Sequence, residues 1–547
     1  MMKTRHTHIE AIGKDCIGHI FALMALKELG SVIVRISKQW KHIVELCMAK
    51  RDEVLEPNVD AESLNAIFTA LGQLQSPIGR RHIGKAHFGP RIPWRFLPEV
   101  IRSIFAKTLA SSLAVPSSLH TLRLNNAALS SEDFDKIFTA LHHHSALTHL
   151  NVSNNRLGRH YGHHDHDEDG EDDDDDNDDN ITKSLAELIR HNRAITTLII
   201  HDCHISSRRM VNILSALQPT TTLETLMLDG NTLHSASIHI LAQVLSTNTS
   251  LTDLFVKYGS LQVDDMKAFC RPIANSRSLK SLRLGLNRFD DACAQPLSEM
   301  IRCNSALTYL DIGHRIRAKG MPIILNAVSS NSTIEKLGIG CNHLDSECAS
   351  ALADMLARNC TLTELELSEM WEEMDWKSFF VGLRQNRSIT KINLCHNEFT
   401  IDDIRPLVSL VTDSDHPSPI RSIDLSYSSH CDESISLIAD MLKHSNCRLT
   451  SLMMPSYEMT PTGFETLLLA LHHNTSLTQV NLSCRHFKFS DHLVSRLLTL
   501  AQSNTTIKTF NFERSSLTSE MINSISVTEC KNDNLKKSYQ ARLTRWS

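Results

Sequence analysis

One eleven-residue phrase, Leu-x-x-Leu-x-Leu-x-x-Asn-x-Leu, recurs along the 547-residue chain about every 28 residues. One copy consists of Leu147, Leu150, Val152, Asn155 and Leu157. A fixed period of this length indicates a stack of repeated units, in which each unit buries its apolar face against the next. The chain is therefore expected to form a repeat array with an extended binding surface, and not a globular enzyme with an enclosed pocket.

The first apolar residue of the phrase marks fourteen repeats. It is Leu or Ile at positions 119, 147, 195, 223, 251, 279, 307, 334, 362, 389, 420, 449, 477 and 507. The phrase alternates apolar and polar residues, which predicts a strand. The second half of each unit, for example Ile238, Leu241 and Leu245, has i, i+3, i+7 spacing and predicts a helix.

A period near 28 residues with one helix per unit resembles the ribonuclease-inhibitor class of leucine-rich repeats. The resemblance covers about residues 119 to 525. It implies an α/β solenoid of about 14 repeats, a horseshoe with a parallel sheet inside and helices outside. The class contains inhibitors, GTPase activators, immune receptors and ubiquitin-ligase adaptors, so the fold alone does not define the partner.

The asparagine at the ninth position of the phrase is expected to be structural, because a buried amide can satisfy backbone groups where the strand turns outward. Cys203 takes its place in the third repeat. The asparagines assigned to this scaffold are Asn155, Asn231, Asn287, Asn342 and Asn397.

The formal net charge of −6 is concentrated in one segment, because residues 165–179 hold twelve Asp or Glu, and the rest of the chain is mildly basic. No signal peptide and no membrane helix is expected. The 14 scattered Cys indicate a reduced compartment. Sequons at Asn248, Asn331 and Asn474 are interpreted as by-products of helix-ending Asn. The predicted location is cytoplasmic, with the nucleus, or a host cytoplasm for a pathogen effector, as alternatives.

The domain prediction has four parts: a helical module at 9–50, a linker and N-terminal cap at 51–118, the solenoid at 119–527, and a tail at 528–547. Within 51–118, the stretch 79–94 is basic and rich in Gly and Pro, and is interpreted as a linker closing into the cap. A helix from Pro98 to Leu113 is expected to form a leading half-repeat.

The N-terminal module reads Ile12-Gly13-Lys14-Asp15-Cys16-Ile17-Gly18-His19-Ile20-Phe21, then Leu26-Lys27-Glu28-Leu29, then Ser37-Lys38-Gln39-Trp40. Residues 9–46 resemble an F-box, a module of three small helices that docks on the adaptor of a Skp–cullin–F-box ubiquitin ligase. So short a segment gains stability by packing on a partner. The resemblance implies adaptor contacts by Ile12, Ile17, Ile20, Phe21, Leu26, Leu29 and Trp40. The alternative is a helical cap over the first repeat.

The second repeat carries an insertion at 162–180 that begins Gly162-His163-His164 and continues as the acidic run. A segment of this composition cannot bury apolar surface and is expected to be a disordered, solvated tether. Histidines beside aspartates can chelate divalent metal, but a site without fixed geometry is weak, so no metal site is assigned. A helix is expected to resume near Ile181.

Side chains between the ladder leucines should point into the concave face, where a partner would bind. Aromatic and Arg residues dominate interface hot spots. The first predicted cluster, in repeats five to seven, comprises Phe255, Lys257, Tyr258, Arg283, Tyr309, Asp311 and His314. The second, in repeat nine, comprises Glu366, Glu369 and Trp371, with Met370 in the place of the scaffold Asn. Trp376 falls at a core position of the next helix.

No phosphate-binding loop, metalloprotease or hydrolase motif occurs, so the chain is predicted to be non-catalytic and to need no cofactor. The leading hypothesis is a substrate receptor of a Skp–cullin–F-box ligase that binds a target protein on the concave face, with no nucleic acid and no membrane as partner. The alternatives are a protein-interaction scaffold or sensor without a ligase role, and a Ran-type GTPase-activating protein.

Overall fold

The computed structural model describes most of the repeat array. The described residues are 85–87, 99–114, 118–157, 180–217, 222–233, 236–259, 261, 263–317, 319–342, 344–370, 374–428, 431–456, 459–483 and 490–511. The predicted module at 9–50, nearly all of the insertion, Trp371 and the tail at 528–547 lie outside these residues. The described elements fall into two compact units, divided between Leu279 and Lys280.

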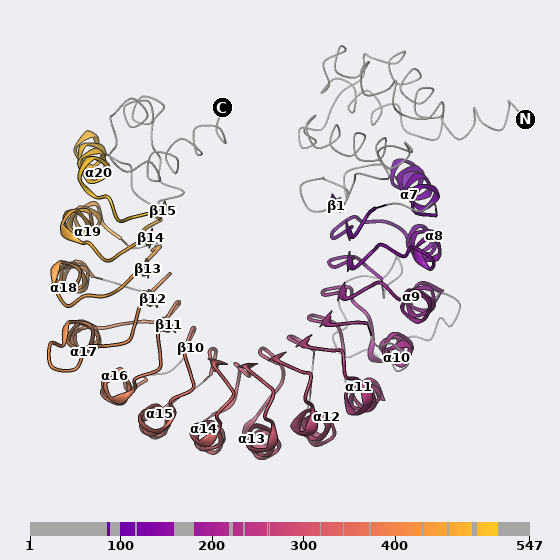
Figure 1. The fold of residues 1–547 in the computed structure, drawn as a ribbon, viewed down its shortest axis with the longest axis horizontal. Helices are drawn as coiled ribbons and strands as arrows, with labels where there is room; N and C mark the ends of the chain where they lie inside the picture. Colours follow the sequence, from indigo (N-terminus) through magenta and orange to yellow (C-terminus); the bar gives the residue numbers. More distant parts are fainter. Residues whose placement is uncertain are drawn as a thin grey trace, which may run out of the picture. The chain divides into compact units, whose positions relative to one another are not determined.

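Unit 1 alternates short strands with helices (Figure 1). Its strands pair in parallel and in sequence order, from β1 to β6. The strands are β1 (Lys85–His87), β2 (Thr121–Arg123), β3 (His149–Asn151), β4 (Thr197–Ile199), β5 (Thr225–Met227) and β6 (Asp253–Phe255). The helices are α7 (Glu99–Leu113), α8 (Ser131–Leu141), α9 (Asn180–His191), α10 (Ser207–Ala216), α11 (Ala236–Thr247) and α12 (Val263–Asn275).

Unit 2 repeats the same arrangement, and its strands pair in parallel from β7 to β15. The strands are β7 (Ser281–Arg283), β8 (Tyr309–Asp311), β9 (Lys336–Gly338), β10 (Glu364–Glu366), β11 (Lys391–Asn393), β12 (Ser422–Asp424), β13 (Ser451–Met453), β14 (Gln479–Asn481) and β15 (Thr509–Asn511). The helices are η3 (Asp291–Cys293), α13 (Ala294–Cys303), α14 (Met321–Ser330), α15 (Ser346–Arg358), α16 (Trp376–Gln385), α17 (Ile401–Thr412), α18 (Asp432–Lys443), α19 (Pro461–His473) and α20 (Asp491–Ser503).

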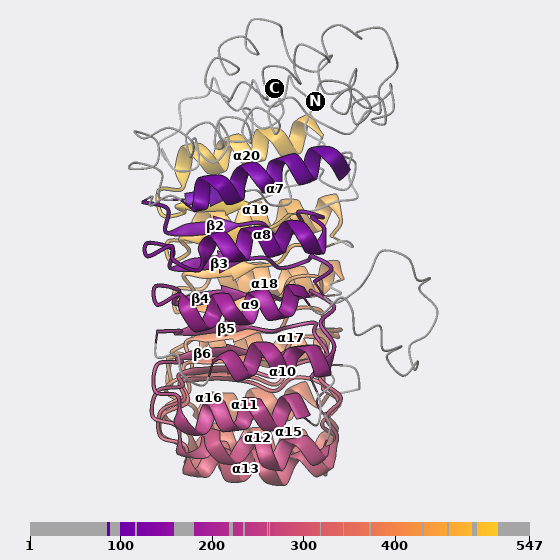
Figure 2. The ribbon, with the colours of Figure 1, turned by 90° about the vertical axis from the view of Figure 1, so that its right-hand side faces the viewer.

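The core of each unit lies between a layer of strands and a layer of helices. The middle residue of each strand from β2 to β15 points into this core, as Leu310 does on β8, and is at most 2% exposed. The helices complete it with a stripe such as Ile435, Ile438 and Leu442 of α18, which recur at i, i+3 and i+7. In unit 1 each helix packs on the next, and Figure 2 shows α7 to α12 stacked in order. The predicted leucine-rich-repeat solenoid is therefore confirmed as the fold class.

The repeat boundaries follow the ladder residues. Strands β2 to β15 each begin two residues after a predicted ladder position, from Thr121 after Leu119 to Thr509 after Ile507. Helix α7 occupies the segment predicted for a leading half-repeat. Strand β1 adds a strand within the basic stretch 79–94, which was interpreted as a linker, and it pairs with β2. Its sequence, Lys-Ala-His, does not contain the repeat phrase, so periodicity could not find it.

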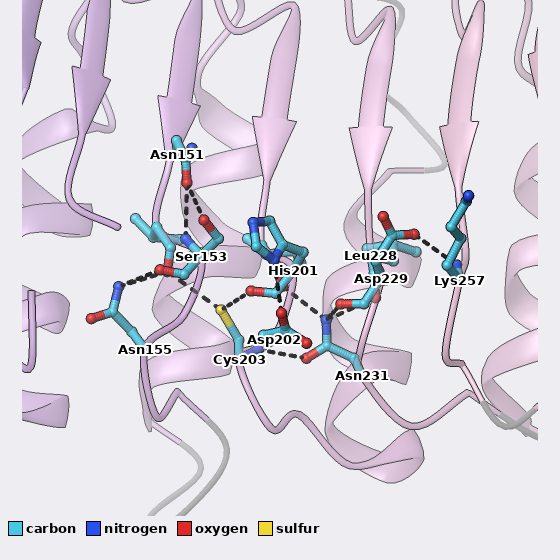
Figure 3. Close-up of polar contacts among 12 residues, drawn as sticks. Asn151, Ser153, Asn155, His201, Asp202, Cys203, Leu228, Asp229, Asn231 and Lys257 are labelled. Atoms are coloured by element: carbon cyan, nitrogen blue, oxygen red, sulfur yellow. Dashed lines mark hydrogen bonds and ion pairs between the residues drawn. The ribbon is translucent and has the colours of Figure 1, made fainter. Parts of the chain in front are cut away.

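The ninth-position asparagines form a buried ladder of hydrogen bonds, as predicted (Figure 3). Asn155 donates to the carbonyls of Leu124 and Val152 at 2.9 and 2.7 Å and accepts from the Ala127 N–H at 2.9 Å. Asn231 repeats this pattern one turn further, with the carbonyls of Ile200 and Leu228 at 2.8 and 2.9 Å. Each asparagine thus joins its own repeat to the preceding one.

Cys203 occupies the asparagine position between these two (Figure 3). Its thiol donates to the Val152 and His201 carbonyls at 3.4 and 3.5 Å, and its N–H donates to the Asn231 amide oxygen at 3.2 Å. Complete burial raises the pKa of the Cys203 thiol from its ordinary 9.0 to about 12. The thiol is therefore protonated and serves as a weak donor in place of the amide.

A second asparagine ladder closes the helices. Asn474 follows α19, donates to the Leu442 carbonyl of the previous repeat at 2.8 Å, and accepts from the Leu477 N–H at 2.8 Å. Asn331 makes the same contacts with the Ile301 carbonyl and the Ile334 N–H, both at 2.8 Å. The side-chain nitrogens of these two sequons are therefore used in the scaffold, in agreement with their interpretation as products of the repeat.

Candidate binding surface on the strand faces

In strands β2 to β15 the first and third residues point away from the helices, and they form two rows across the strands of each unit. The first row of unit 2 is Ser281, Tyr309, Lys336, Glu364, Lys391, Ser422, Ser451, Gln479 and Thr509. The third row is Arg283, Asp311, Gly338, Glu366, Asn393, Asp424, Met453, Asn481 and Asn511. Helices α13 to α20 lie on the other side of this sheet, so no described helix covers the rows (Figure 1).

Short polar side chains in the third row serve the scaffold. Asn393 accepts the N–H of Cys395 at 3.0 Å, and Asp424 accepts the N–H of Ser426 at 2.8 Å. Asp311 makes the same contact with the N–H of Gly313 at 3.2 Å and is only 6% exposed. This local bond from residue i to the N–H of i+2 stabilises the turn that follows the strand. Asp311, predicted to contact a partner, therefore has a scaffold role in this structure.

Arg283, Tyr309 and Glu366 form a network that crosses several strands of unit 2. The Arg283 guanidinium carbon lies 4.6 Å from the centroid of the Tyr309 ring, within the range of a cation–π contact. The Tyr309 hydroxyl donates to Glu366, with both carboxylate oxygens at 3.3 Å. Burial and the Glu366 carboxylate raise the pKa of the Tyr309 phenol, so the hydroxyl remains a donor at neutral pH.

Glycines make room for this network. Tyr309 stands on β8 and Glu366 on β10, and the residue of β9 in register with Glu366 is Gly338. A Cβ at Gly338 would lie 3.0 Å from a carboxylate oxygen of Asp311, and a Cβ at Gly285 would meet the same oxygen at 3.0 Å. Side chains here would crowd Asp311, so glycine permits the close packing beneath the network.

A second charged group lies beside the network in the first row. Lys336 and Lys391 flank Glu364, with their ammonium nitrogens 2.9 and 3.2 Å from one carboxylate oxygen. Partial burial disfavours ionisation of Glu364, but the two lysines outweigh it and hold the pKa of Glu364 below its ordinary value. Each lysine remains at least 41% exposed, so both stay accessible to a partner.

The structure divides the first predicted cluster between the two units. Arg283, Tyr309, Asp311 and His314 belong to unit 2, where Arg283 and Tyr309 are in contact. His314 is half-buried, and its ring nitrogen Nδ1 lies 2.9 Å from the carbonyl of the ladder residue Asn287.

The other three members belong to unit 1. Phe255 is 9% exposed, Lys257 is half-buried, and Tyr258 is 60% exposed. The backbone N–H of Lys257 donates to the Asp229 carboxylate at 2.7 Å.

The second predicted cluster is described in part. Glu366 joins the network above, and Glu369 accepts a hydrogen bond from the Cys341 thiol at 3.4 Å. Trp371 lies outside the described residues. Met370, in the place of the scaffold Asn, is buried and donates its N–H to Asn397 at 2.8 Å. Trp376 is buried against Phe379, Phe380 and Phe399, as its core position predicts.

Sequence reasoning missed the two lysines beside Glu364, Lys336 and Lys391, and also a stacked pair at the turns after β11 and β12. The His396 and Tyr427 rings are 4.8 Å apart at 26°, and Tyr427 is 38% exposed. Counting two residues beyond each ladder residue would have placed the three charged residues in one row. The choice of large and charged side chains in that row is the available signal.

Among the residues that the structure describes, no cluster of three or more His, Cys, Asp or Glu could hold a metal ion. None of the described helices combines the length and apolar character needed to cross a membrane.

No protein-family model matches the chain. A NACHT, LRR and PYD domains-containing protein 5 from Bos taurus is 29% identical over 321 residues, covering 53% of this chain and 29% of that protein. A ribonuclease inhibitor from Sus scrofa is 23% identical over 334 residues, covering 60% of this chain and 72% of the inhibitor. A solved internalin from Listeria monocytogenes gives a TM-score of 0.38 at 16% identity over 77% of this chain and 95% of the internalin.

The chain spans less than a third of the length of the NACHT, LRR and PYD proteins that it matches first, with 24% to 29% of each covered. The similarities to the ribonuclease inhibitor and to the NACHT, LRR and PYD proteins agree with the fourteen described repeat strands, β2 to β15. The chain is a leucine-rich-repeat protein that resembles ribonuclease inhibitor and the NACHT, LRR and PYD domains-containing proteins.

Proposed function

We propose that the chain is a non-catalytic protein-interaction scaffold that binds a partner protein on the strand face of unit 2. The observation that carries the proposal is the Arg283–Tyr309–Glu366 network, which holds an Arg and a Tyr on a face that no described helix covers. Arg and Tyr are the residue types most enriched at interface hot spots. The similarity to ribonuclease inhibitors supports a protein as the partner.

The network also explains how such a surface would gain affinity. The Tyr309 ring is fixed by Arg283 on one side and by Glu366 at its hydroxyl, so little side-chain freedom is lost when a partner binds. Lys336 and Lys391 provide charge beside it, and their Glu364 counter-ion limits the net potential. Charges at the edge of an interface contribute more to association rate and specificity than to affinity.

Site-specific photo-crosslinking in cells tests the proposal. A benzophenone amino acid at Ser422, in the first row on β12, should yield discrete adducts with the partner. The matched position is Lys443, at the end of α18 in the same repeat, which should yield none. Arg283→Ala should reduce the Ser422 adduct without changing expression. Adducts from Lys443 alone, or a Ser422 adduct insensitive to Arg283→Ala, would contradict binding on this face.

The resemblance of residues 9–46 to an F-box suggests a more specific function. These residues lie outside the part of the chain that the structure describes. On that hypothesis the module binds a Skp-type adaptor and cullin, and the solenoid holds the target near the ubiquitin-loaded enzyme, so that transfer becomes quasi-intramolecular. The similarities to ribonuclease inhibitor and to the NACHT, LRR and PYD proteins favour the scaffold, and the ligase role remains a prediction.

Binding of the full chain to a purified Skp-type adaptor separates the two functions. If the module is an F-box, the wild type binds, and the double variant Ile20→Asp with Phe21→Asp does not. Tyr309→Ala serves as the control, because it alters the strand face and should leave adaptor binding unchanged. If the wild type does not bind the adaptor, the ligase role is excluded and the interaction scaffold is the function that stands.

A further inference from the structure

Three apolar side chains stand next to one another in the third row of unit 1, where several other strands hold an Asn or Asp that serves the turn. Ile199 on β4, Met227 on β5 and Phe255 on β6 are in register. On the preceding strand the same row holds Asn151, which accepts the N–H of Ser153 at 3.0 Å. Ile199 and Met227 are half-buried and Phe255 is 9% exposed. We call Ile199, Met227 and Phe255 the apolar row.

Helices α7 to α12 all lie on the other side of this sheet, so no described helix of unit 1 covers the apolar row (Figure 1). Ile199 and Met227 thus present apolar atoms on this face beside the largely buried Phe255. Contiguous apolar surface of this kind marks interaction sites, whereas single exposed apolar residues are ordinary. The turns provide a further aromatic residue beside it.

Tyr258 follows the apolar row at the turn after β6 and is 60% exposed. Its φ of 52° lies in the left-handed region, which is unfavourable for a bulky residue. The equivalent turn positions of unit 1 hold residues that adopt this region at low cost, namely Asn126, Asn154, Asp202 and Gly230. Tyr258 therefore places an exposed aromatic side chain beside the apolar row, and tyrosine is one of the residue types enriched at interface hot spots.

The surroundings of the apolar row are acidic. Asp202 and Glu224 are exposed, and Asp229 and Asp253 are half-buried. Lys257, which is also half-buried, follows β6 in the same group. Neither Glu224 nor Asp253 forms an ion pair with any described residue. A partner with basic groups on either side of an apolar contact would therefore complement this surface.

We propose that the apolar row and Tyr258 bind one face of an amphipathic helix whose flanks carry Lys or Arg. Neighbouring strands lie about 4.8 Å apart, so the row spans roughly 10 Å across three strands. Apolar residues at i, i+3 or i+4, and i+7 span about 10.5 Å along a helix. Such a helix lying across the strands would match the row residue for residue, with its basic flanks near Asp253 and Asp229.

This surface belongs to unit 1 and is additional to the one proposed on unit 2. The crosslinking experiment above places no probe or variant in unit 1, so either proposal can fail without the other.

The test measures binding of a fluorescently labelled Leu/Lys peptide of about 15 residues, with its leucines on one helical face, to the full chain. Two peptides serve as controls: one of the same composition with scrambled order, and a Leu/Glu counterpart. The acidic segment 165–179 attracts both Lys peptides equally, so a preference for the amphipathic order does not come from that segment.

The variants use residues that the chain already places in equivalent positions. The double variant Ile199→Asn with Met227→Asn copies Asn151, and Tyr258→Asn copies Asn126 and Asn154, so all should fold. Each should weaken binding of the amphipathic Leu/Lys peptide by roughly fivefold or more, the loss expected for an interface residue whose truncation costs about 1 kcal/mol. The matched control, Tyr427→Asn, changes an exposed tyrosine at the same turn position in unit 2 and should have no effect.

Tighter binding of the amphipathic Leu/Lys peptide than of both controls, with loss in the unit 1 variants alone, supports the proposal. Equal binding of the scrambled peptide, equal binding of the Leu/Glu peptide, or retention of affinity in the double variant overturns it. Circular dichroism of each variant shows whether a loss of binding reflects a loss of folding.

Discussion

Asn397 and Asn393 lie four residues apart in one repeat, yet their amides have different roles. Asn397 is buried, donates to the carbonyls of Leu367 and Leu394 at 2.8 and 2.9 Å, and accepts the N–H of Met370 at 2.8 Å. Asn393 is half-buried on the strand face and accepts one bond from Cys395 at 3.0 Å. The first joins two repeats, and the second stabilises only its own turn.

Asn397→Ala should therefore lower the free energy of unfolding by roughly 2 to 4 kcal/mol, because it leaves a buried N–H and two carbonyls without that partner. Asn393→Ala should cost about 1 kcal/mol or less, since water can reach its half-buried turn. Urea unfolding followed by circular dichroism measures both. Equal losses would contradict the separation between ladder and turn asparagines.

The cysteines offer a second test at the same scale. Burial raises the pKa of Cys203 to about 12 and of Cys293 to about 11, whereas Cys303 and Cys360 are exposed. The thiolate is the reactive form, so native protein at pH 8 should be alkylated by iodoacetamide at Cys303 and Cys360 long before Cys203. Peptide mass spectrometry after timed quenching reads the order. Early modification of Cys203 would show that its repeat opens readily.

The same pKa shift fixes the direction of a pH effect. The folded pKa of Cys203 lies above its ordinary 9.0, so the folded state retains the proton longer than the unfolded state. The contribution of the Cys203 thiol to the free energy of unfolding is complete below pH 9 and is lost as the pH rises from 9 towards about 12. Cys203→Ala removes this titration, so the wild type should lose more stability than the variant between pH 8 and 10.5. Parallel losses would contradict the shift.

At the scale of elements, the period of the sequence predicts strands and helices because every repeat obeys the same packing rule. Strand β1 escapes prediction because its register comes from pairing with β2 and not from a ladder residue. The Tyr309–Glu366 contact escapes for a related reason. It joins residues 57 positions apart across β9, where Gly338 is in register with Glu366. The repeat therefore predicts which face of the sheet each side chain lies on, but not which residue of another strand it contacts.

Gly382 in α16 gives an element-scale prediction in which two effects oppose each other. Alanine is the better helix former by about 1 kcal/mol. A Cβ at Gly382, however, would lie 2.4 Å from the Cα and 2.5 Å from the Cβ of Ala353 on α15. Backbone cannot rotate away, so Gly382→Ala should separate the two helices and lower the free energy of unfolding by about 1 to 3 kcal/mol.

Adding Ala353→Gly to Gly382→Ala should restore only part of that loss, because the Ala353 Cα remains in place. Thermal unfolding of the two variants and of Ala353→Gly alone gives the comparison. A stabilised Gly382→Ala protein would mean that helix propensity prevails and that α15 and α16 are less closely packed than described.

At the scale of the whole molecule, stability is transmitted from neighbour to neighbour. The described strands of unit 2 pair in sequence order from β7 to β15, and the helices pack in the same order. Arrays of this kind behave as a sum of repeat stabilities and nearest-neighbour interfaces. The loss of one asparagine should therefore destabilise its own repeat and the adjacent repeats more than distant ones.

Asn397→Ala weakens the interface between the repeats of β10 and β11, since its amide bonds carbonyls in both. Hydrogen exchange should accelerate most in β10, β11 and α16 and progressively less towards β14, because each further repeat must open against an intact interface. Peptide-level exchange by mass spectrometry measures this gradient, with Asn393→Ala as the matched control. Uniform acceleration across unit 2 would show instead that the unit unfolds as one cooperative block.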